Sequence, residues 1–166
     1  MVILFYGLSG SGKTTLAQKI AKNIDKAVLL DGDEVRKGLN SDLGLSLEDR
    51  RENIRRTCEV AKLLHGQGLS VFISVICPTE EMRKMAKEII GEDLFIVYLS
   101  TPLDVCKERD VKGLYATVGD KMTGIGSPFE EAKTFDFEID TTNKDTDTCV
   151  REIMCAYLTH IWKNGR

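Results

Sequence analysis

The feature that most constrains the fold of this chain is GLSGSGKTT, residues 7–15. It follows the apolar run Val2–Tyr6, which has the length of a buried strand, and overlaps the start of Thr14–Asn23, where apolar residues recur at helical spacing. The glycines allow the backbone to curl, so that successive N–H groups and the N-terminus of the helix point at one anion. The pattern G-x-x-x-x-G-K-[ST] between a strand and a helix predicts a loop that holds the phosphates of a nucleoside triphosphate.

Side chains of this loop have predictable tasks. The Lys13 ammonium can reach the β- and γ-phosphates, and the Thr14 hydroxyl can ligate Mg²⁺. The residues that we expect to bind the triphosphate are Gly7, Ser9, Gly10, Ser11, Gly12, Lys13, Thr14 and Thr15.

Along the rest of the chain, strand-length apolar runs alternate with amphipathic segments. This order predicts a single α/β domain over residues 1–166, with a mainly parallel five-stranded sheet flanked by helices. The expected strands are Val2–Tyr6, Ala27–Leu30, Val71–Cys77, Leu94–Leu99 and Phe137–Ile139. The expected helices are Thr14–Asn23, one capped by Ser46 and running to about His65, one capped by Thr79, Leu103–Arg109 and Thr146–Trp162.

Residues 110–131 interrupt the alternation, because they are rich in glycine and have no clear period. A loop of this length within a compact domain is usually functional, so we expect a lid, with a disordered surface insertion as the alternative.

Composition limits the possible partners. The net charge of −3 argues against a large basic surface for nucleic acid, and no stretch approaches the roughly 18 apolar residues of a membrane span. The five cysteines are widely spread and form no C-x-x-C pair, which favours free thiols in a reducing cytoplasm. The expected partner is therefore a small nucleotide, bound by a cytoplasmic protein without nucleic acid or membrane.

The length of the chain narrows the class of nucleotide enzyme. A guanine-specific GTPase usually carries N-K-x-D, but here Asn143-Lys144 is followed at once by Asp145. A motor ATPase would need a longer chain, whereas a small kinase with the cofactors ATP and Mg²⁺ fits.

A candidate acid follows the second predicted strand, in Asp31-Gly32-Asp33. In open α/β sheets, ligands collect at the carboxyl ends of strands. Asp33 at this edge could hold Mg²⁺ through water or polarise an attacking hydroxyl. Asp-Gly is also a common turn pair, so a surface turn is the alternative.

Cations and an amide follow this acid. Arg36 comes first, and Arg50, Asn53 and Arg56 are then spaced three apart on a predicted helix, so these three share one face. Such a group suits an anionic substrate, and a solvated basic helix face is the alternative.

Residues 30–56, LDGDEVRKGLNSDLGLSLEDRRENIRR, resemble the adenylylsulfate kinase (APS kinase) family. The resemblance resumes at EVAK (59–62), CKERDVKGLYA (106–116) and TGIGSPFE (123–130). It implies a P-loop NTPase kinase fold, a homodimer, and transfer of the ATP γ-phosphoryl to the ribose 3′-hydroxyl of adenosine 5′-phosphosulfate (APS). The product is 3′-phosphoadenosine 5′-phosphosulfate.

The resemblance also implies roles for single residues. Asp33 would lie beside the 3′-hydroxyl and Mg²⁺, Lys112 would reach the phosphates from the lid, and Arg109 would lie along the base of ATP. The implied catalytic residues are Lys13, Asp33 and Lys112, and the implied metal site is Thr14 with Asp33. The implied substrate-binding residues are Asp33, Arg36, Leu45, Arg50, Asn53, Ile76, Cys77, Lys112 and Met122.

The chain departs from the family pattern around the acceptor base. Leu45 and Met122 replace two phenylalanines that typically sandwich the adenine, and Cys77 after Ile76 replaces a serine sometimes described as a phosphorylated intermediate. Direct transfer is therefore favoured, with Cys77 as a buried thiol. The lid is also shorter than usual. Two explanations stay open: an APS kinase with a looser adenine pocket, or the same 3′-hydroxyl chemistry on another nucleotide, such as cytidine diphosphoramidate.

Overall fold

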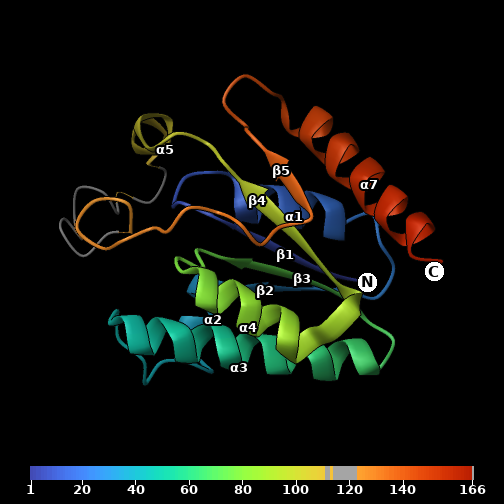
Figure 1. Cartoon of the computed structure of the whole chain (residues 1–166), viewed down its shortest axis with the longest axis horizontal. Coiled ribbons are helices and arrows are strands. Elements are labelled where there is room, and N and C mark those ends of the chain that lie inside the picture. Colours follow the sequence, from blue (N-terminus) through green and yellow to red (C-terminus); the bar gives the residue numbers. More distant parts are fainter. Residues whose placement is uncertain (111–112, 114–122, 166) are drawn as a thin grey trace.

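The computed structural model describes residues 1–110, 113 and 123–165 of the 166-residue chain. At its centre lies a five-stranded sheet with the order β2-β3-β1-β4-β5, in which every neighbouring pair is parallel (Figure 1). The predicted five-stranded parallel sheet is thus confirmed. The strands are β1 (Val2–Gly7), β2 (Ala27–Asp31), β3 (Ser70–Val75), β4 (Leu94–Leu99) and β5 (Phe137–Ile139).

Helices cover both faces of the sheet. α3 and α4 pack on one face, and α1 and α7 pack on the other (Figure 1). None of the described helices is both long and apolar enough to span a bilayer. The helices are α1 (Lys13–Ala21), α2 (Gly32–Lys37), α3 (Leu47–Gly66), α4 (Glu80–Ile90), α5 (Leu103–Arg109) and α7 (Thr146–Lys163), with a 3-10 turn η1 (Gly91–Asp93).

The central strand β1 is buried on both sides. Because side chains alternate along a strand, Leu4 and Tyr6 enter the core beneath α3 and α4, whereas Ile3 and Phe5 enter the core beneath α1 and α7. All four are fully buried. A continuous apolar run is what a parallel strand with both faces covered requires, and it holds the loop that follows β1 on a rigid base.

Two predicted helix starts are confirmed by their caps. The Ser46 hydroxyl accepts a hydrogen bond from the Asp49 N–H at 3.0 Å and donates to the Asp49 carboxylate at 2.7 Å. The Thr79 hydroxyl accepts from the Met82 N–H at 3.3 Å. Each cap satisfies an N–H group that has no partner within its helix, which fixes where α3 and α4 begin.

Two local predictions are corrected. The third strand ends at Val75 rather than at Cys77, whose φ of 48° lies in the left-handed region and takes the chain out of the sheet. The segment after β2 is the short helix α2, which was not predicted. Asp31 is its N-cap and accepts from the Asp33 N–H at 2.9 Å. A six-residue helix that begins with glycine has little intrinsic propensity, so the sequence gives no clear signal for it.

Candidate active site

A cavity of about 630 Å³ opens at the carboxyl ends of β1, β2 and β3. Loops after these strands, one side of α3 and residues after β5 line it, so the strand order brings distant segments together. Predicted site residues in its wall are Ser9, Gly10, Gly12, Lys13, Thr14, Thr15, Asp33, Arg36, Leu45, Arg50, Asn53, Ile76, Cys77 and Arg109. Gly7 and Ser11 are buried and do not line it, and Lys112 and Met122 lie outside the described residues.

The phosphate loop depends on glycine at two close approaches. A Cβ on Gly7 would lie 2.6 Å from the Leu99 carbonyl oxygen, and a Cβ on Gly10 would lie 2.6 Å from the Cys106 carbonyl oxygen. Gly10 also has a φ of 80° and Gly12 a φ of 98°, which L side chains rarely adopt. Gly12 is the N-cap of α1 and adds no capping side chain, and the first residues of α1 line the cavity.

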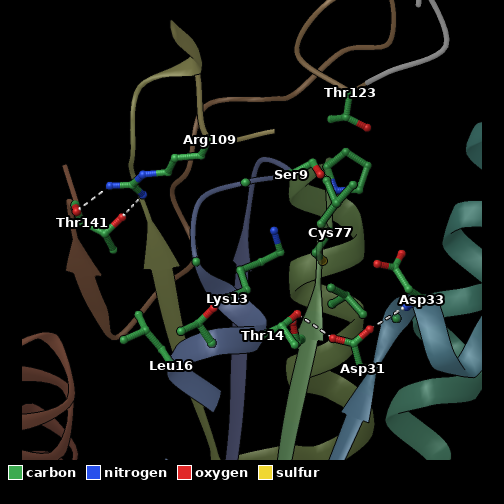
Figure 2. A pocket seen from close by; sticks show the side chains of 18 of the residues that line it. Ser9, Lys13, Thr14, Leu16, Asp31, Asp33, Cys77, Arg109, Thr123 and Thr141 are labelled. Atoms are coloured by element: carbon green, nitrogen blue, oxygen red, sulfur yellow. Dashed lines mark hydrogen bonds between the residues drawn. The ribbon is translucent and has the colours of Figure 1, made fainter. Parts of the chain in front are cut away.

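Lys13 lies over the loop that precedes it. Its Nζ donates to the Leu8 carbonyl at 2.6 Å and lies 3.5 Å from the Ser11 hydroxyl. The side chain is 8% exposed and lines the cavity. Figure 2 shows Lys13 and Asp33 on opposite sides of the space, with Thr14 and Asp31 below them in the view. The Lys13 ammonium therefore lies beside the backbone of the phosphate loop, in the wall of the cavity.

The acid that touches the predicted metal-ligating hydroxyl is Asp31, not Asp33. The Thr14 hydroxyl donates to Asp31 Oδ2 at 2.6 Å and lies 3.0 Å from the Ser74 hydroxyl (Figure 2). Asp31 and Ser74 are partners in the β2–β3 register, and Asp31 is 8% exposed. Asp33 is exposed in the same wall. The contact of Asp31 was not predicted, and the signal for it was its place as the last residue of β2, at the carboxyl edge of the sheet.

Arg36 and Arg50 hold the chain between α2 and α3. Arg36 Nη1 donates to the Gly44 carbonyl at 2.8 Å, and Arg50 Nε donates to the Leu45 carbonyl at 2.9 Å. Arg50 Nη1 also donates to the Thr123 hydroxyl at 3.0 Å. Burial lowers the pKa of both guanidinium groups, and the charge of Arg36 lowers the pKa of Arg50 further. Two neighbouring cations, Arg36 half-buried and Arg50 buried, favour an anionic ligand between them.

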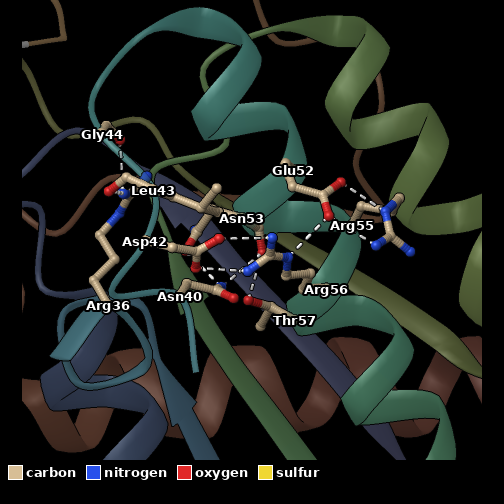
Figure 3. Close-up of polar contacts among 10 residues, drawn as sticks. All are labelled: Arg36, Asn40, Asp42, Leu43, Gly44, Glu52, Asn53, Arg55, Arg56 and Thr57. Carbon is tan, nitrogen blue, oxygen red and sulfur yellow. Dashed lines mark hydrogen bonds and ion pairs between the residues drawn. The ribbon is translucent and has the colours of Figure 1, made fainter. Parts of the chain in front are cut away.

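The three polar residues predicted to share one face of α3 have two different environments. Asn53 and Arg50 are buried and line the cavity. Arg56 instead forms ion pairs with Asp42 at 2.7 Å and with Glu52 at 2.9 Å, away from the cavity wall (Figure 3). The anion-binding interpretation therefore agrees with the positions of Arg50 and Asn53, and the solvated basic face describes Arg56.

Arg109 lies at the opposite end of the cavity. Its guanidinium donates to the Thr141 hydroxyl and to the Thr141 carbonyl, both at 2.8 Å (Figure 2). The Thr141 hydroxyl in turn donates to the Ser11 carbonyl at 3.0 Å, which ties the end of β5 to the phosphate loop. Thr141, Lys144, Thr146 and Cys149 line this end, and the sequence analysis assigned none of them.

Arg83 of α4 fixes the wall that contains Cys77. The guanidinium is fully buried and donates to the carbonyls of Cys77 at 3.3 Å and Glu130 at 2.9 Å. It pairs with Glu80 at 2.8 Å, and the Glu80 carboxylate also accepts from the Thr134 hydroxyl. The end of the predicted lid, at Glu130, and the segment after it, at Thr134, are thereby attached to the loop after β3 and the start of α4.

A comparison with known families decides the relationship. The model of the adenylylsulphate kinase family matches residues 1–140. The chain belongs to the adenylylsulphate kinase family.

Relatives and solved structures agree with this assignment. A probable adenylyl-sulfate kinase of Halalkalibacterium halodurans is 46% identical, over 99% of this chain and 84% of its own. The APS kinase CysC of Mycobacterium tuberculosis, solved in complex with AMPPNP and APS, is 38% identical with a TM-score of 0.85, over 94% of this chain and 96% of its own. A hexameric APS kinase from Thiobacillus denitrificans is 27% identical with a TM-score of 0.72, over 95% of this chain and 29% of its own.

Among the departures from the adenylylsulphate kinase pattern, Leu45 and Cys77 can be located. Leu45 lines the cavity and is 46% exposed, so an aliphatic side chain stands where a base could pack. Cys77 is 1% exposed, and burial raises the pKa of its thiol far above the usual range. This burial agrees with the prediction of a buried thiol.

Proposed function

We propose that the protein transfers the γ-phosphoryl group of ATP to the ribose 3′-hydroxyl of APS. The observation that carries the proposal is one continuous cavity that joins the phosphate loop to Arg36, Arg50 and Asn53, with Asp33 in the wall between them. Membership of the adenylylsulphate kinase family supports the acceptor, as does the relative solved with AMPPNP and APS.

The donor nucleotide would lie along the phosphate loop. Loop N–H groups and the N-terminus of α1 would hold the triphosphate, with Lys13 at the β- and γ-phosphates. The Arg109 guanidinium, fixed by its two hydrogen bonds to Thr141, would lie against the adenine base of ATP. Positioning of this kind supplies most of the catalysis in phosphoryl transfer, because the transition state needs alignment and neutralised oxygens.

The acceptor would be held by its anionic group and its ribose. Arg36, Arg50 and Asn53 supply N–H donors from one side of the cavity. Asp33, at the start of α2, would accept the hydrogen bond of the 3′-hydroxyl as the oxygen attacks the γ-phosphorus. Lys112 is proposed as a second cation at the phosphates from the resemblance alone.

The residues around Thr14 fit Mg²⁺. A hydroxyl and two nearby carboxylates, Asp31 and Asp33, are hard oxygen ligands of the type that Mg²⁺ prefers, and the Thr14 hydroxyl already contacts Asp31. When bound, the ion would neutralise charge on the β- and γ-phosphate oxygens. Asp31 would orient Thr14 towards it.

Direct transfer is the route that Cys77 supports. Because burial keeps this thiol protonated at neutral pH, it is a poor nucleophile, and no phosphorylated enzyme is needed. The γ-phosphoryl would pass in one step from ATP to the 3′-oxygen, with ADP as the leaving group and the hydroxyl proton released.

The test is ADP release by the purified protein with ATP and Mg²⁺, with APS, with cytidine diphosphoramidate, or without acceptor. We expect release well above the acceptor-free rate with APS. Release with the cytidine compound and not with APS would contradict the proposal. That result would mean that the protein phosphorylates the 3′-hydroxyl of a nucleotide with another base, which Leu45 and Met122 in place of the two phenylalanines would allow.

Three further features belong to this proposal: one domain over residues 1–166, a cytoplasmic location and a homodimer. The five free cysteines suit a reducing compartment. The name of the hexameric relative shows that assembly occurs in the family. Light scattering after gel filtration should give twice the mass of the chain, and the mass of a single chain would exclude the dimer.

A further inference from the structure

Asn40 is a fully buried polar residue between α2 and α3 that the proposed chemistry does not use. Its Nδ2 donates to Asn53 Oδ1 at 2.9 Å and lies 3.5 Å from the Asn53 carbonyl oxygen (Figure 3). Its backbone is fixed as well, because its N–H donates to the Val35 carbonyl at 2.9 Å and its carbonyl accepts from the Leu43 N–H at 3.1 Å. Asn40 is therefore a rigid donor aimed at one side of Asn53.

This contact determines which way the Asn53 amide faces. The Asn53 carbonyl can only accept, and it also receives the Thr57 hydroxyl at 2.7 Å, so the Asn40 atom beside it must be the NH₂ group. Because the Asn40 NH₂ group donates, the atom of the Asn53 side-chain amide that faces it must be the oxygen, Oδ1. The Asn53 Nδ2 is then left on the side of the cavity, where Asn53 forms part of the wall.

The arrangement leaves one polar atom unsatisfied. Asn40 Oδ1 is buried without a hydrogen-bond partner among the described residues. Buried acceptors of this kind are rare because they lose their hydration without replacement. A valine or leucine would fill the same space without that loss, so the donor of Asn40 must matter more than packing.

We propose that Asn40 is a positioning residue that holds the Asn53 amide with its NH₂ group towards the acceptor. Together with Arg36 and Arg50, this amide makes the acceptor end of the cavity a set of N–H donors, which suits the oxygens of a phosphosulfate or of a ribose hydroxyl. The identity of that ligand rests on the proposed function. Reversal of the amide would turn its oxygen towards the anion and repel it.

The first test is Asn40→Asp, which places acceptors where the Asn40 NH₂ lies and forces the Asn53 amide to reverse. We expect the KM for the acceptor to rise by roughly ten- to a hundredfold, with the KM for ATP within about twofold of wild type. Asn40→Ala only frees the amide to turn, so its effect should be smaller. Asn23→Asp, an exposed position with the same change of charge, is the control.

A double-mutant cycle separates this role from a general structural one. In an Asn53→Ala background, Asn40→Asp should raise the KM for the acceptor no further, because the amide through which it acts is absent. An equal increase in both backgrounds would overturn the inference. If Asn40→Asp does not fold, the cycle with Asn40→Ala gives the same answer.

Side-chain amide NMR supplies a readout that does not depend on turnover. We expect the Asn40 NH₂ protons to be protected from exchange and the Asn53 NH₂ protons to exchange quickly. In Asn40→Asp, the Asn53 NH₂ should become the protected one. A protected Asn53 NH₂ in the wild-type protein would overturn the inference, whereas failure of APS to turn over would contradict only the proposed function.

Discussion

The two ends of the cavity are built in different ways. The donor end lies within one short stretch of chain, residues 7–15, and glycines at two close approaches set the shape of its backbone. The acceptor end, Arg36, Arg50 and Asn53, presents side chains. Two of these are held by contacts that span 8 residues, from Arg36 to Gly44, and 73 residues, from Arg50 to Thr123. A site for a triphosphate can thus be local in sequence, whereas the site for its partner depends on the whole fold.

The largest effect should come from the donor end. Lys13→Ala removes the ammonium that faces the phosphates, and we expect kcat to fall by about a thousandfold. The fold should remain, because the bonds of Lys13 to Leu8 and Ser11 stay within the loop. Lys22→Ala, at an exposed position just after α1, should change nothing in the same steady-state assay. A fall in kcat of less than tenfold would show that the loop N–H groups stabilise the phosphates without the Lys13 ammonium.

Asp31 connects the two ends, because it accepts from the Thr14 hydroxyl and also caps α2, which carries Asp33 and Arg36. Asp31→Asn should lower kcat by roughly ten- to a hundredfold and raise the Mg²⁺ concentration needed for half-maximal rate. Titration of the rate with Mg²⁺ measures both changes, with the exposed Asp25→Asn as the control. If the Mg²⁺ dependence of the rate is unchanged, Asp31 does not contribute to the metal site.

A change at the acceptor end should affect one substrate only. Arg50→Lys cannot keep the bonds to both the Leu45 carbonyl and the Thr123 hydroxyl, since an ammonium lacks the planar fork of a guanidinium. We expect about a tenfold rise in the KM for the acceptor and little change in the KM for ATP. Arg51→Lys, next to it on the exposed side of α3, is the matched control. Equal rises for both substrates would mean that the two ends are not separable.

The smallest effect concerns the wall behind the acceptor end. Glu80 is half-buried, and although burial raises the pKa of its carboxyl, hydrogen bonds from Thr134 and Arg83 outweigh this and lower it overall. The stability that it contributes is therefore complete above the ordinary pKa of 4.5 and is lost as pH falls through the lower folded pKa. Glu80→Gln should reduce the free energy of unfolding at pH 7 by about 1–3 kcal/mol.

Denaturant unfolding between pH 3 and pH 7 measures the free energy of unfolding of wild type and Glu80→Gln. The Glu80→Gln protein should lose less stability than wild type on acidification. Glu81→Gln, which breaks only the exposed pair with Arg51, should follow the wild-type pH profile. A Glu80→Gln profile parallel to wild type would mean that another carboxylate carries the acid sensitivity.

The same contrast explains what the sequence could and could not predict. The phosphate loop, the five strands and the caps at Ser46 and Thr79 are local patterns, and the structure agrees with them. The short helix α2 depends on its cap rather than on propensity, so it was missed. The contact of Asp31 with Thr14 and the bond of Arg109 to Thr141 join a helix to the end of a strand or to the segment after it. They arise only when the fold brings these segments together, and no spacing in the sequence encodes them.

The acceptor end shows this limit most clearly. Arg50, Asn53 and Arg56 have the same spacing and could not be separated by pattern. The fold places Arg50 and Asn53 in the cavity wall, whereas Arg56 forms ion pairs with two carboxylates outside it. Burial thus decides between a binding face and a solvated one, and burial depends on what packs against α3.

The measurement that tests the central claim most directly is ³¹P NMR of the product formed from ATP and APS. The account predicts a new phosphomonoester signal coupled to the ribose 3′-proton, with the 5′-phosphosulfate signal retained. A signal from inorganic phosphate alone, or an ester at another oxygen of the acceptor, would contradict it.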